Sequence, residues 1–242
     1  MTPFFSELKA PVLDWLYPRR CDACGGRVEE AGRHWCWDCR AEVMVLHQPF
    51  CRVCGTPVAG EVTEQFICHQ CRKQPPHYDA CRSAARFDGA VRESVLALKY
   101  HGHQWLVADL VDFLEAAVRT WYQADSFDVV LPVPLYSRRL RERGFNQAGL
   151  LAEEMAGRLG VSVEQNFLRR IRDTGTQTRL TGAARRSNLR KAFALKDGVD
   201  LSGQTVLLVD DVMTTGTTLS ECARVLRNAG ARGVFGVTVA HG

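Results

Sequence analysis

The chain has 242 residues and an ordinary apolar content, and its 31 Lys and Arg against 27 Asp and Glu give a formal net charge of +4. This length suits one large domain, or a medium domain beside a small one. No apolar run approaches the length of a membrane-spanning helix, which argues against a protein of the helical membrane class.

The first twenty residues are rich in apolar side chains, but charges at Glu7, Lys9 and Asp14 interrupt them. A signal peptide or a spanning helix needs an uninterrupted apolar stretch, so the pattern favours an amphipathic helix that packs on the protein. We therefore expect a cytoplasmic protein without membrane insertion.

Eight of the ten cysteines form four Cys-x-x-Cys pairs in the first third of the chain. A gap of two residues lets both sulfur atoms face one tetrahedral ion, so two pairs complete a four-thiolate zinc site. Sequential pairing needs only short loops, whereas a cross-braced arrangement would interleave the pairs. A disulfide framework and a redox role are alternatives that the expected reducing compartment and the serial spacing disfavour. We predict two structural zinc ions, one held by Cys21, Cys24, Cys36 and Cys39 and the other by Cys51, Cys54, Cys68 and Cys71.

Two histidines, His34 and His69, lie close to the cysteine pairs in the sequence. Eight thiolates already complete two tetrahedral sites, so we expect both imidazoles to stay outside the ligand sets.

The cysteine spacing ends in a polar stretch with two prolines, residues 72–83, which we interpret as a domain boundary. Beyond it, apolar runs alternate with amphipathic stretches, a pattern typical of α/β organisation. The predicted domains are an N-terminal helix and zinc-binding module at 1–75 and an α/β domain at 80–242. Helices are expected at 91–100, 107–118, 146–159 and 217–229, and strands at 127–133, 204–209 and 234–239.

An arginine-rich segment follows the strand expected at 127–133. Two prolines fix an extended turn at the carboxyl end of this strand, where open α/β sheets bind ligands. Guanidinium groups suit pyrophosphate because they stay charged and can bind two oxygens at once. A solvated basic turn is the alternative. The candidate residues are Pro132, Val133, Pro134, Arg138, Arg139 and Arg143.

The segment at 169–193 is long, basic and poor in apolar residues. Loops of this length in compact domains are usually functional or disordered. We interpret it as a lid that closes over a bound ligand, excludes water and brings Arg179, Arg185 or Arg186 to the pyrophosphate leaving group. A solvated arm or a nucleic-acid contact is the alternative.

Residues 204–219, QTVLLVDDVMTTGTTL, combine an apolar strand, two carboxylates and a threonine-rich turn before a helix. Backbone N–H groups at the helix start, the helix dipole and threonine hydroxyls can surround a phosphate dianion. The carboxylates of Asp210 and Asp211 follow the strand, where they can accept hydrogen bonds from two ribose hydroxyls. We predict a ribose 5-phosphate site, although an ordinary strand-turn-helix with a capping Asp pair is the alternative. The phosphate loop comprises Met213, Thr214, Thr215, Gly216, Thr217 and Thr218.

Residue by residue, this run resembles the 5-phosphoribosyl-1-pyrophosphate (PRPP) loop of type I phosphoribosyltransferases. In that family the acidic pair holds the ribose 2- and 3-hydroxyls, and the loop holds the 5-phosphate. The resemblance implies these roles for Asp210 and Asp211 and for the loop at 213–218. It also places residues 132–134 at the pyrophosphate loop, with a proline-valine-proline turn where many members have small residues.

The whole chain resembles the ComF family, in which a cysteine-knuckle zinc module precedes a phosphoribosyltransferase-like domain. The resemblance implies an α/β fold with a parallel sheet flanked by helices. Family members are associated with DNA uptake in natural transformation or with the use of DNA as a nutrient. Its markers are the four cysteine pairs, Leu98-Lys99-Tyr100, LPVPL, RERGFNQA, TQTRL with RRSNLRKAF, and LLVDDVMTTGTTL.

Two kinds of function follow from this resemblance. An enzyme would be a phosphoribosyltransferase that releases pyrophosphate from Mg²⁺-bound PRPP, the metal being held mainly by substrate oxygens and water. Its catalytic residues would be Asp210, Asp211, Arg185 and Arg186. A binding protein would sense PRPP or a nucleotide, or grip single-stranded DNA as an adaptor beside DNA-uptake proteins. An acceptor pocket with a general base distinguishes the two, and His101 and His103 are candidates by residue type alone.

The charge distribution bears on the DNA hypothesis. Residues 131–193 carry thirteen basic and five acidic side chains, a net of +8, whereas residues 19–75 carry eight and seven. Phosphate backbones are held largely by Lys and Arg. We expect any DNA contact on the basic segment at 169–191 rather than on the zinc module.

Overall fold

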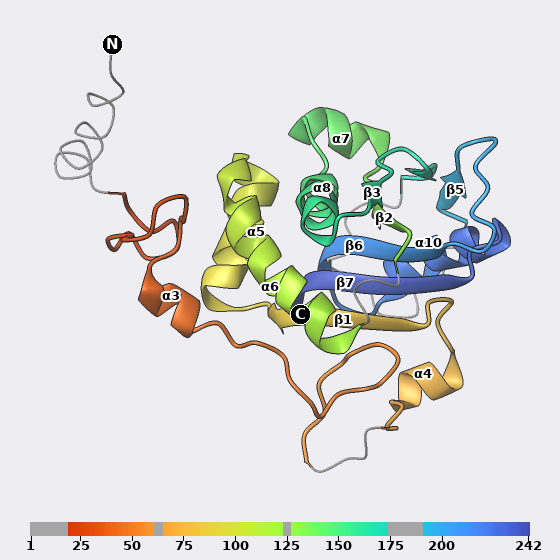
Figure 1. Cartoon of the computed structure of the whole chain (residues 1–242), viewed down its shortest axis with the longest axis horizontal. Helices are drawn as coiled ribbons and strands as arrows, with labels where there is room; N and C mark the ends of the chain where they lie inside the picture. Colours follow the sequence, from red (N-terminus) through yellow and green to blue (C-terminus); the bar gives the residue numbers. More distant parts are fainter. Residues whose placement is uncertain (1–18, 61–64, 123–126, 174–190) are drawn as a thin grey trace.

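A five-stranded sheet forms the centre of the computed structural model, which describes residues 19–60, 65–122, 127–173 and 191–242. The strands lie in the order β1-β7-β6-β2-β3, and every neighbouring pair is parallel (Figure 1). Their bounds are β1 Ala80–Arg86, β2 Val129–Pro132, β3 Ser162–Val163, β6 Thr205–Met213 and β7 Gly233–His241.

Helices cover both faces of the sheet. One face carries α5 (Gly89–His101), the short 3-10 helix η1 (Gln104–Leu106), α6 (Val107–Trp121) and α8 (Gln147–Leu159). The other face carries α10 (Thr217–Asn228) and, beside it, an antiparallel pair made of β4 (Leu168–Arg170) and β5 (Phe193–Leu195). Helix α7 (Ser137–Arg143) follows β2. None of the described helices is both long and apolar enough to cross a membrane.

The cysteine-rich region forms two separate modules, one on each side of the sheet. The first cysteine module, residues 19–42, contains α3 (Trp37–Ala41), and the second, residues 50–60 and 65–73, contains α4 (His69–Lys73). The chain between them runs along β1, where Leu46 N donates to Ala84 O at 2.9 Å and Arg86 N donates to Met44 O at 2.9 Å. This segment covers the outer edge of β1, which would otherwise present unpaired backbone groups.

Each module shares a hydrophobic core with one face of the sheet. Trp35 of the first module is buried with Leu98 and Leu110 of the α5 and α6 layer. Cys51 of the second module is buried with Leu219 of α10 on the opposite face. Full burial of one such leucine contributes about 1.5–3 kcal/mol. The modules are therefore parts of the fold rather than appendages to it.

The helices and strands expected between residues 91 and 239 all occur, with differences at their ends, whereas the helix expected in the first twenty residues lies almost wholly outside the described residues. The helix expected at 146–159 follows Asn146 at its N-cap and stops before Gly160, as predicted. The strand expected at 204–209 runs on to Met213, because the pairing with β7 continues from Asp210 opposite Thr238 to Met213 opposite His241. The two carboxylates thus lie within the strand instead of after it.

Several elements were not expected from the sequence, among them β1, α7 and the pair of β4 and β5. Strand β1 lies partly inside the stretch interpreted as a boundary, since ACRSAAR has weak strand propensity and is placed by pairing with the distant β7. Helix α7 buries none of its residues, so it has no apolar periodicity to detect. The antiparallel pair β4 and β5 joins the two ends of the segment interpreted as a lid.

Candidate functional site

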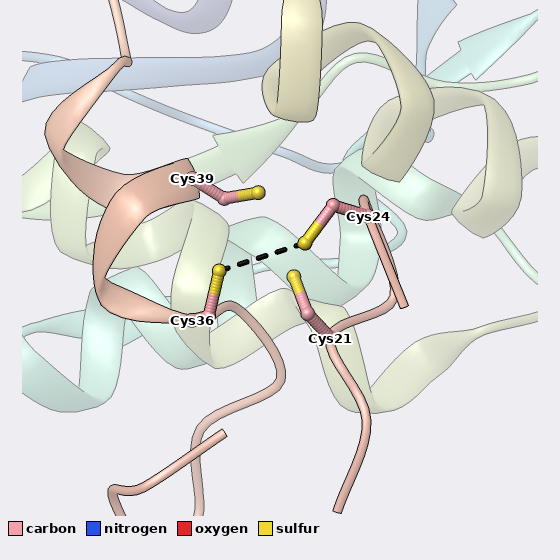
Figure 2. A group of neighbouring side chains, drawn as sticks. All are labelled: Cys21, Cys24, Cys36 and Cys39. Carbon is pink, nitrogen blue, oxygen red and sulfur yellow. Dashed lines mark hydrogen bonds between the residues drawn. The ribbon is translucent and has the colours of Figure 1, made fainter. Parts of the chain in front are cut away.

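The eight paired cysteines gather into two groups of four. Cys21, Cys24, Cys36 and Cys39 form one, and Cys51, Cys54, Cys68 and Cys71 the other, with the sulfur atoms of each group within 4.8 Å of one another. Figure 2 shows the four side chains of the first group pointing toward a common centre. The sequential pairing is confirmed, and all eight are free thiols rather than disulfides.

Both groups have the dimensions of a tetrahedral zinc site. The Sγ atoms of Cys24 and Cys36 lie 3.6 Å apart, and those of Cys54 and Cys68 lie 3.8 Å apart. Four sulfurs around a zinc ion at about 2.3 Å would lie about 3.8 Å from one another. In the second group, hydrogen bonding from Cys71 and Thr56 lowers the pKa of Cys54 to about 4, which favours the thiolate that a metal ion requires.

The nearby histidines do not join either group of ligands. His34 instead forms two hydrogen bonds with Asp109 of α6. Its backbone N lies 3.1 Å, and its Nδ1 3.0 Å, from Asp109 Oδ2. His69 is the first residue of α4. The expectation that both stay outside the ligand sets is therefore confirmed among the described residues.

The phosphate loop closes the carboxyl end of β6. Thr214 and Thr215 form a turn that ends at Gly216, where a φ of +67° starts α10. The hydroxyls of Thr215 and Thr217 lie 2.9 Å apart. A pocket of about 30 Å³ opens here, lined by Asp210, Val212 and residues 213–219. The chain thus presents the N-terminus of a helix and several hydroxyls around one small cavity, an arrangement suited to an anion.

The two carboxylates of β6 point to opposite faces of the sheet, because side chains alternate along a strand. Asp211 is buried on the helical face of α5 and α8, where Oδ1 lies 2.8 Å from Lys99 Nζ and Oδ2 accepts from Gln147 Nε2 at 2.7 Å. Asp210 lines the phosphate pocket. Burial and the charge of Asp211 raise the pKa of Asp210 to about 8. Of the two, Asp211 is the carboxylate that is paired directly with a lysine.

Lys99 and Gln147 are site residues to which the sequence analysis assigned no role. Lys99 belongs to α5 and Gln147 to α8, and Arg143 donates a hydrogen bond to Gln147 Oε1. The network Lys99, Asp211, Gln147 and Arg143 joins three segments that are far apart in the chain. Lys99 and Gln147 lie in LKY and RERGFNQA, two markers of the ComF resemblance, and that was the only signal that could have identified them.

A larger basic pocket of about 410 Å³ lies beside this network, between the carboxyl ends of α5 and α7. Its lining includes Lys99, Tyr100, His101, Arg139 and Arg143, together with one acidic side chain, Glu142. The Arg143 guanidinium stacks over the Tyr100 ring at 5.6 Å, and burial lowers the pKa of this arginine. We call this cavity the basic pocket; its cationic walls and its size suit a charged small molecule.

Only some of the residues expected to hold pyrophosphate line the basic pocket. Pro132 and Val133 are buried, and Val133 N donates to Val209 O at 2.9 Å, so this turn is anchored to β6. Pro134 is half-buried and follows them. Arg138 is largely exposed and does not line the basic pocket; it pairs with Glu142, which does, at 3.1 Å and with Asp173 at 3.5 Å. Only Arg139 and Arg143 line that pocket.

The candidate general bases also differ in position. His101 lines the basic pocket. His103 stacks on Trp105 at 4.4 Å between ring centroids, and its Nδ1 lies 3.5 Å from Asp22 Oδ1 of the first module. Of the two, only His101 faces the candidate site.

The proposed lid falls outside the described residues, and with it Arg185 and Arg186. The described stem contains Arg170 on β4, whose guanidinium lies over the Phe193 ring at 5.7 Å and interacts electrostatically with Asp210. The stem therefore brings a positive charge to the edge of the sheet where the phosphate pocket opens.

Comparison with known proteins extends these observations to the whole chain. A family model described as a double zinc ribbon domain matches residues 12–72, and one described as a phosphoribosyl transferase domain matches residues 141–241. The two groups of four cysteines are thus the metal sites of a double zinc ribbon, and the parallel sheet is that of the phosphoribosyl transferase fold.

Three relatives align over most of the chain. Competence protein F of Haemophilus influenzae is 31% identical over 215 residues, covering 87% of this chain and 92% of that protein. DNA utilization protein YhgH of Salmonella typhimurium is 31% identical over 210 residues, with 81% and 92% covered. Competence protein ComFC of Bacillus subtilis is 26% identical over 202 residues, with 81% and 78% covered. Since the similarity spans both the zinc ribbon and the phosphoribosyl transferase domain, the chain belongs to the ComF family.

Proposed function

We propose that the chain binds PRPP at the carboxyl edge of its sheet and acts as a phosphoribosyltransferase in DNA uptake or utilisation. The observation that carries this proposal is the sequence of β6, turn and α10, in which a carboxylate pair leads directly into a small pocket at a helix N-terminus. The names of the relatives, which refer to competence and DNA utilisation, support the biological setting.

Different residues would bind the three parts of PRPP: the 5-phosphate, the ribose and the pyrophosphate. The phosphate pocket at 213–218 receives the 5-phosphate, and Asp210 and Asp211 receive the ribose hydroxyls. Asp211 already accepts from Lys99 and Gln147, but an ionised carboxylate has about four acceptor positions, so a hydroxyl can be added. Lys99 and Gln147 then act as positioning residues that hold Asp211 in place.

Pyrophosphate would occupy the basic pocket, where Arg139 and Arg143 are the cationic candidates. Fixed guanidinium groups stabilise the charge that develops on a departing pyrophosphate, so catalysis would rest on positioning and electrostatics. Mg²⁺ would arrive with PRPP and neutralise phosphate charge, held mainly by substrate oxygens and water. Arg185 and Arg186 remain predicted contributors from the segment outside the described residues.

The test is a binding titration with PRPP and Mg²⁺, followed by an assay of pyrophosphate release in the presence of a panel of amines and nucleobases. Asp210→Asn combined with Asp211→Asn should weaken PRPP binding by about tenfold or more, equivalent to about 1.4 kcal/mol. Asp197→Asn, an exposed aspartate away from the site, is the matched control. Unchanged affinity in the double variant would refute the site.

The alternative is a non-catalytic sensor of PRPP or a nucleotide, or a single-stranded DNA-binding adaptor beside uptake proteins. Net charge favours a DNA contact on the basic segment, and such binding should fall steeply with salt. PRPP binding without pyrophosphate release for any acceptor would favour this alternative over the enzyme.

A further inference from the structure

We propose that the second cysteine module, with its metal ion, braces the phosphate loop through Tyr78, so that metal binding and phosphate binding are thermodynamically linked. The inference rests on the proposed function in one respect only, namely that the loop binds a phosphate. It assigns Tyr78 a positioning role.

Tyr78 connects the second module directly to the loop. Its side chain is buried in the same core as Cys51, Cys54 and Cys71 of the module and as Met213 and Leu219 at the two ends of the loop. A Cβ added to Gly216 would lie 2.6 Å from Tyr78 Oη, so the phenol packs against the Gly216 backbone at the point where α10 begins. The turn thus rests on an aromatic side chain that belongs to the same buried cluster as the metal-binding cysteines.

The residue before Tyr78 adds a second contact on the same side of the loop. His77 N donates to Ser220 Oγ at 3.1 Å, and Ser220 lies in the first turn of α10. Because α10 is rigid over its length, a contact at Ser220 also fixes the orientation of the N–H groups at its start. The chain that leaves α4 is therefore attached to the helix that would hold the phosphate.

A separate path reaches the other end of the loop. Cys54 Sγ lies 3.1 Å from Thr56 Oγ1, which lies 3.2 Å from His241 Nε2 on β7. His241 pairs with Met213 in the sheet, and Gly242 N donates to Met213 O at 2.9 Å. One metal ligand is thus three contacts away from the residue that opens the loop.

The module is also held tightly to the sheet, which makes transmission possible. Cys81 N of β1 donates to Val53 O at 2.7 Å. A Cβ at Gly55, whose φ is +70°, would lie 2.5 Å from Cys81 O, so only glycine allows this close approach. Loss of the metal ion would release residues 51–55 and, with them, the packing under Tyr78 and the contact at His241.

Among the described residues, the hydrogen bonds of the first cysteine module to the rest of the protein go to α5, α6 and η1, and the module makes no hydrogen bond to the loop. The two metal sites should therefore differ in their coupling to the loop. Reciprocity requires that a ligand bound in the loop strengthens retention of the second metal ion by the same factor.

Amide hydrogen exchange tests the brace without any ligand. We expect exchange in residues 213–220 to accelerate by about tenfold in Cys51→Ser and in Tyr78→Ala, and to stay unchanged in Cys21→Ser. Tyr78→Phe, which keeps the ring, should restore most of the protection. Tyr122→Ala controls for loss of a large aromatic side chain elsewhere in the core. Unchanged exchange in Tyr78→Ala would overturn the proposal, even if Cys51→Ser failed to fold.

Zinc release then tests the linkage. Full-length protein is mixed with a chromogenic chelator, with and without saturating ribose 5-phosphate, and the release of each zinc ion is followed. One of the two ions should leave about tenfold more slowly when the phosphate is bound, and Tyr78→Ala should abolish this protection. Equal protection of both ions, or of neither in a protein shown by calorimetry to bind ribose 5-phosphate, would contradict the linkage. If calorimetry detects no binding at all, the proposed function fails and the exchange experiment alone decides the brace.

Discussion

The two cysteine modules bind a metal ion with the same ligands yet attach to the fold in different ways. The first module docks on helices through side chains: Trp35 Nε1 donates to Ser94 Oγ at 2.7 Å, and Arg33 and Arg40 pair with Asp112 at 2.6 and 3.0 Å. The second docks on β1 and the carboxyl edge of the sheet, largely through backbone contacts. One module supports the helical layer, and the other supports the candidate site.

This difference shows that a repeated motif does not imply a repeated role. Both modules satisfy the local requirement of four thiolates around one ion, and their spacing is almost the same. Their consequences diverge because the surrounding surfaces differ. Side-chain contacts on α5 and α6 can be lost one at a time, whereas backbone contacts at β1 are lost together when the second module unfolds.

The largest expected effect concerns the two metal ions. Wild-type protein should contain about two zinc ions per chain, and Cys21→Ser and Cys51→Ser about one each. We expect Cys51→Ser to lower the free energy of unfolding by about 4 kcal/mol or more, and Cys21→Ser by clearly less. Metal analysis and calorimetric unfolding provide the measurement. Equal losses would remove the distinction between the modules.

A buried carboxylate anchors the first module. Asp109 is fully buried, accepts from the backbone N and Nδ1 of His34, and has Arg40 at 3.6 Å. Asp109→Ala should cost about 3 kcal/mol, because it removes a fully buried carboxylate and leaves the two His34 donors without their acceptor. Ribose 5-phosphate affinity should not change. Asp38→Ala, at an exposed position of α3, is the control, and denaturant unfolding is the measurement.

The pH dependence of the free energy of unfolding tests the raised pKa of Asp210 on β6. The pKa of Asp210 is raised from 3.8 to about 8, so the folded protein keeps a proton that the unfolded chain has lost between these values. Unfolding releases that proton, and stability should therefore fall as the pH rises from about 4 to about 8. Asp210→Asn should flatten this slope. Denaturation at several pH values would contradict the assignment if the slope were unchanged in the variant.

The smallest expected effect concerns the Thr56 hydroxyl of the second module. Thr56→Val removes the contacts to Cys54 and His241 while keeping the shape of the side chain. We expect a loss of about 1 kcal/mol, with faster exchange at Met213. Thr120→Val, which removes an exposed hydroxyl bond to Ala116 O on α6, serves as the matched control. A result no larger than that control would limit the brace to Tyr78.

The sequence by itself determined those features that depend on neighbouring residues. Cys-x-x-Cys spacing specifies a thiolate pair that can share one ion, and short gaps specify which pairs combine. A run such as LLVDDVMTTGTTL specifies a strand, a turn and a helix because each has its own local pattern. The two metal sites, the parallel α/β fold and the phosphate loop could all be predicted on this basis.

Only the tertiary structure decided which distant groups meet. The extension of β6 by pairing with β7 turned Asp210 and Asp211 to opposite faces, and no local pattern marks that extension. Lys99 and Gln147 reach Asp211 from two other helices, and Tyr78 reaches Gly216 from beyond the second module. Gln147 and Asp211, for example, are 64 residues apart in the sequence. Contacts of this kind therefore depend on the packing of the whole sheet. Local propensity carries no information about them, because their energy is gained only once the layers have assembled.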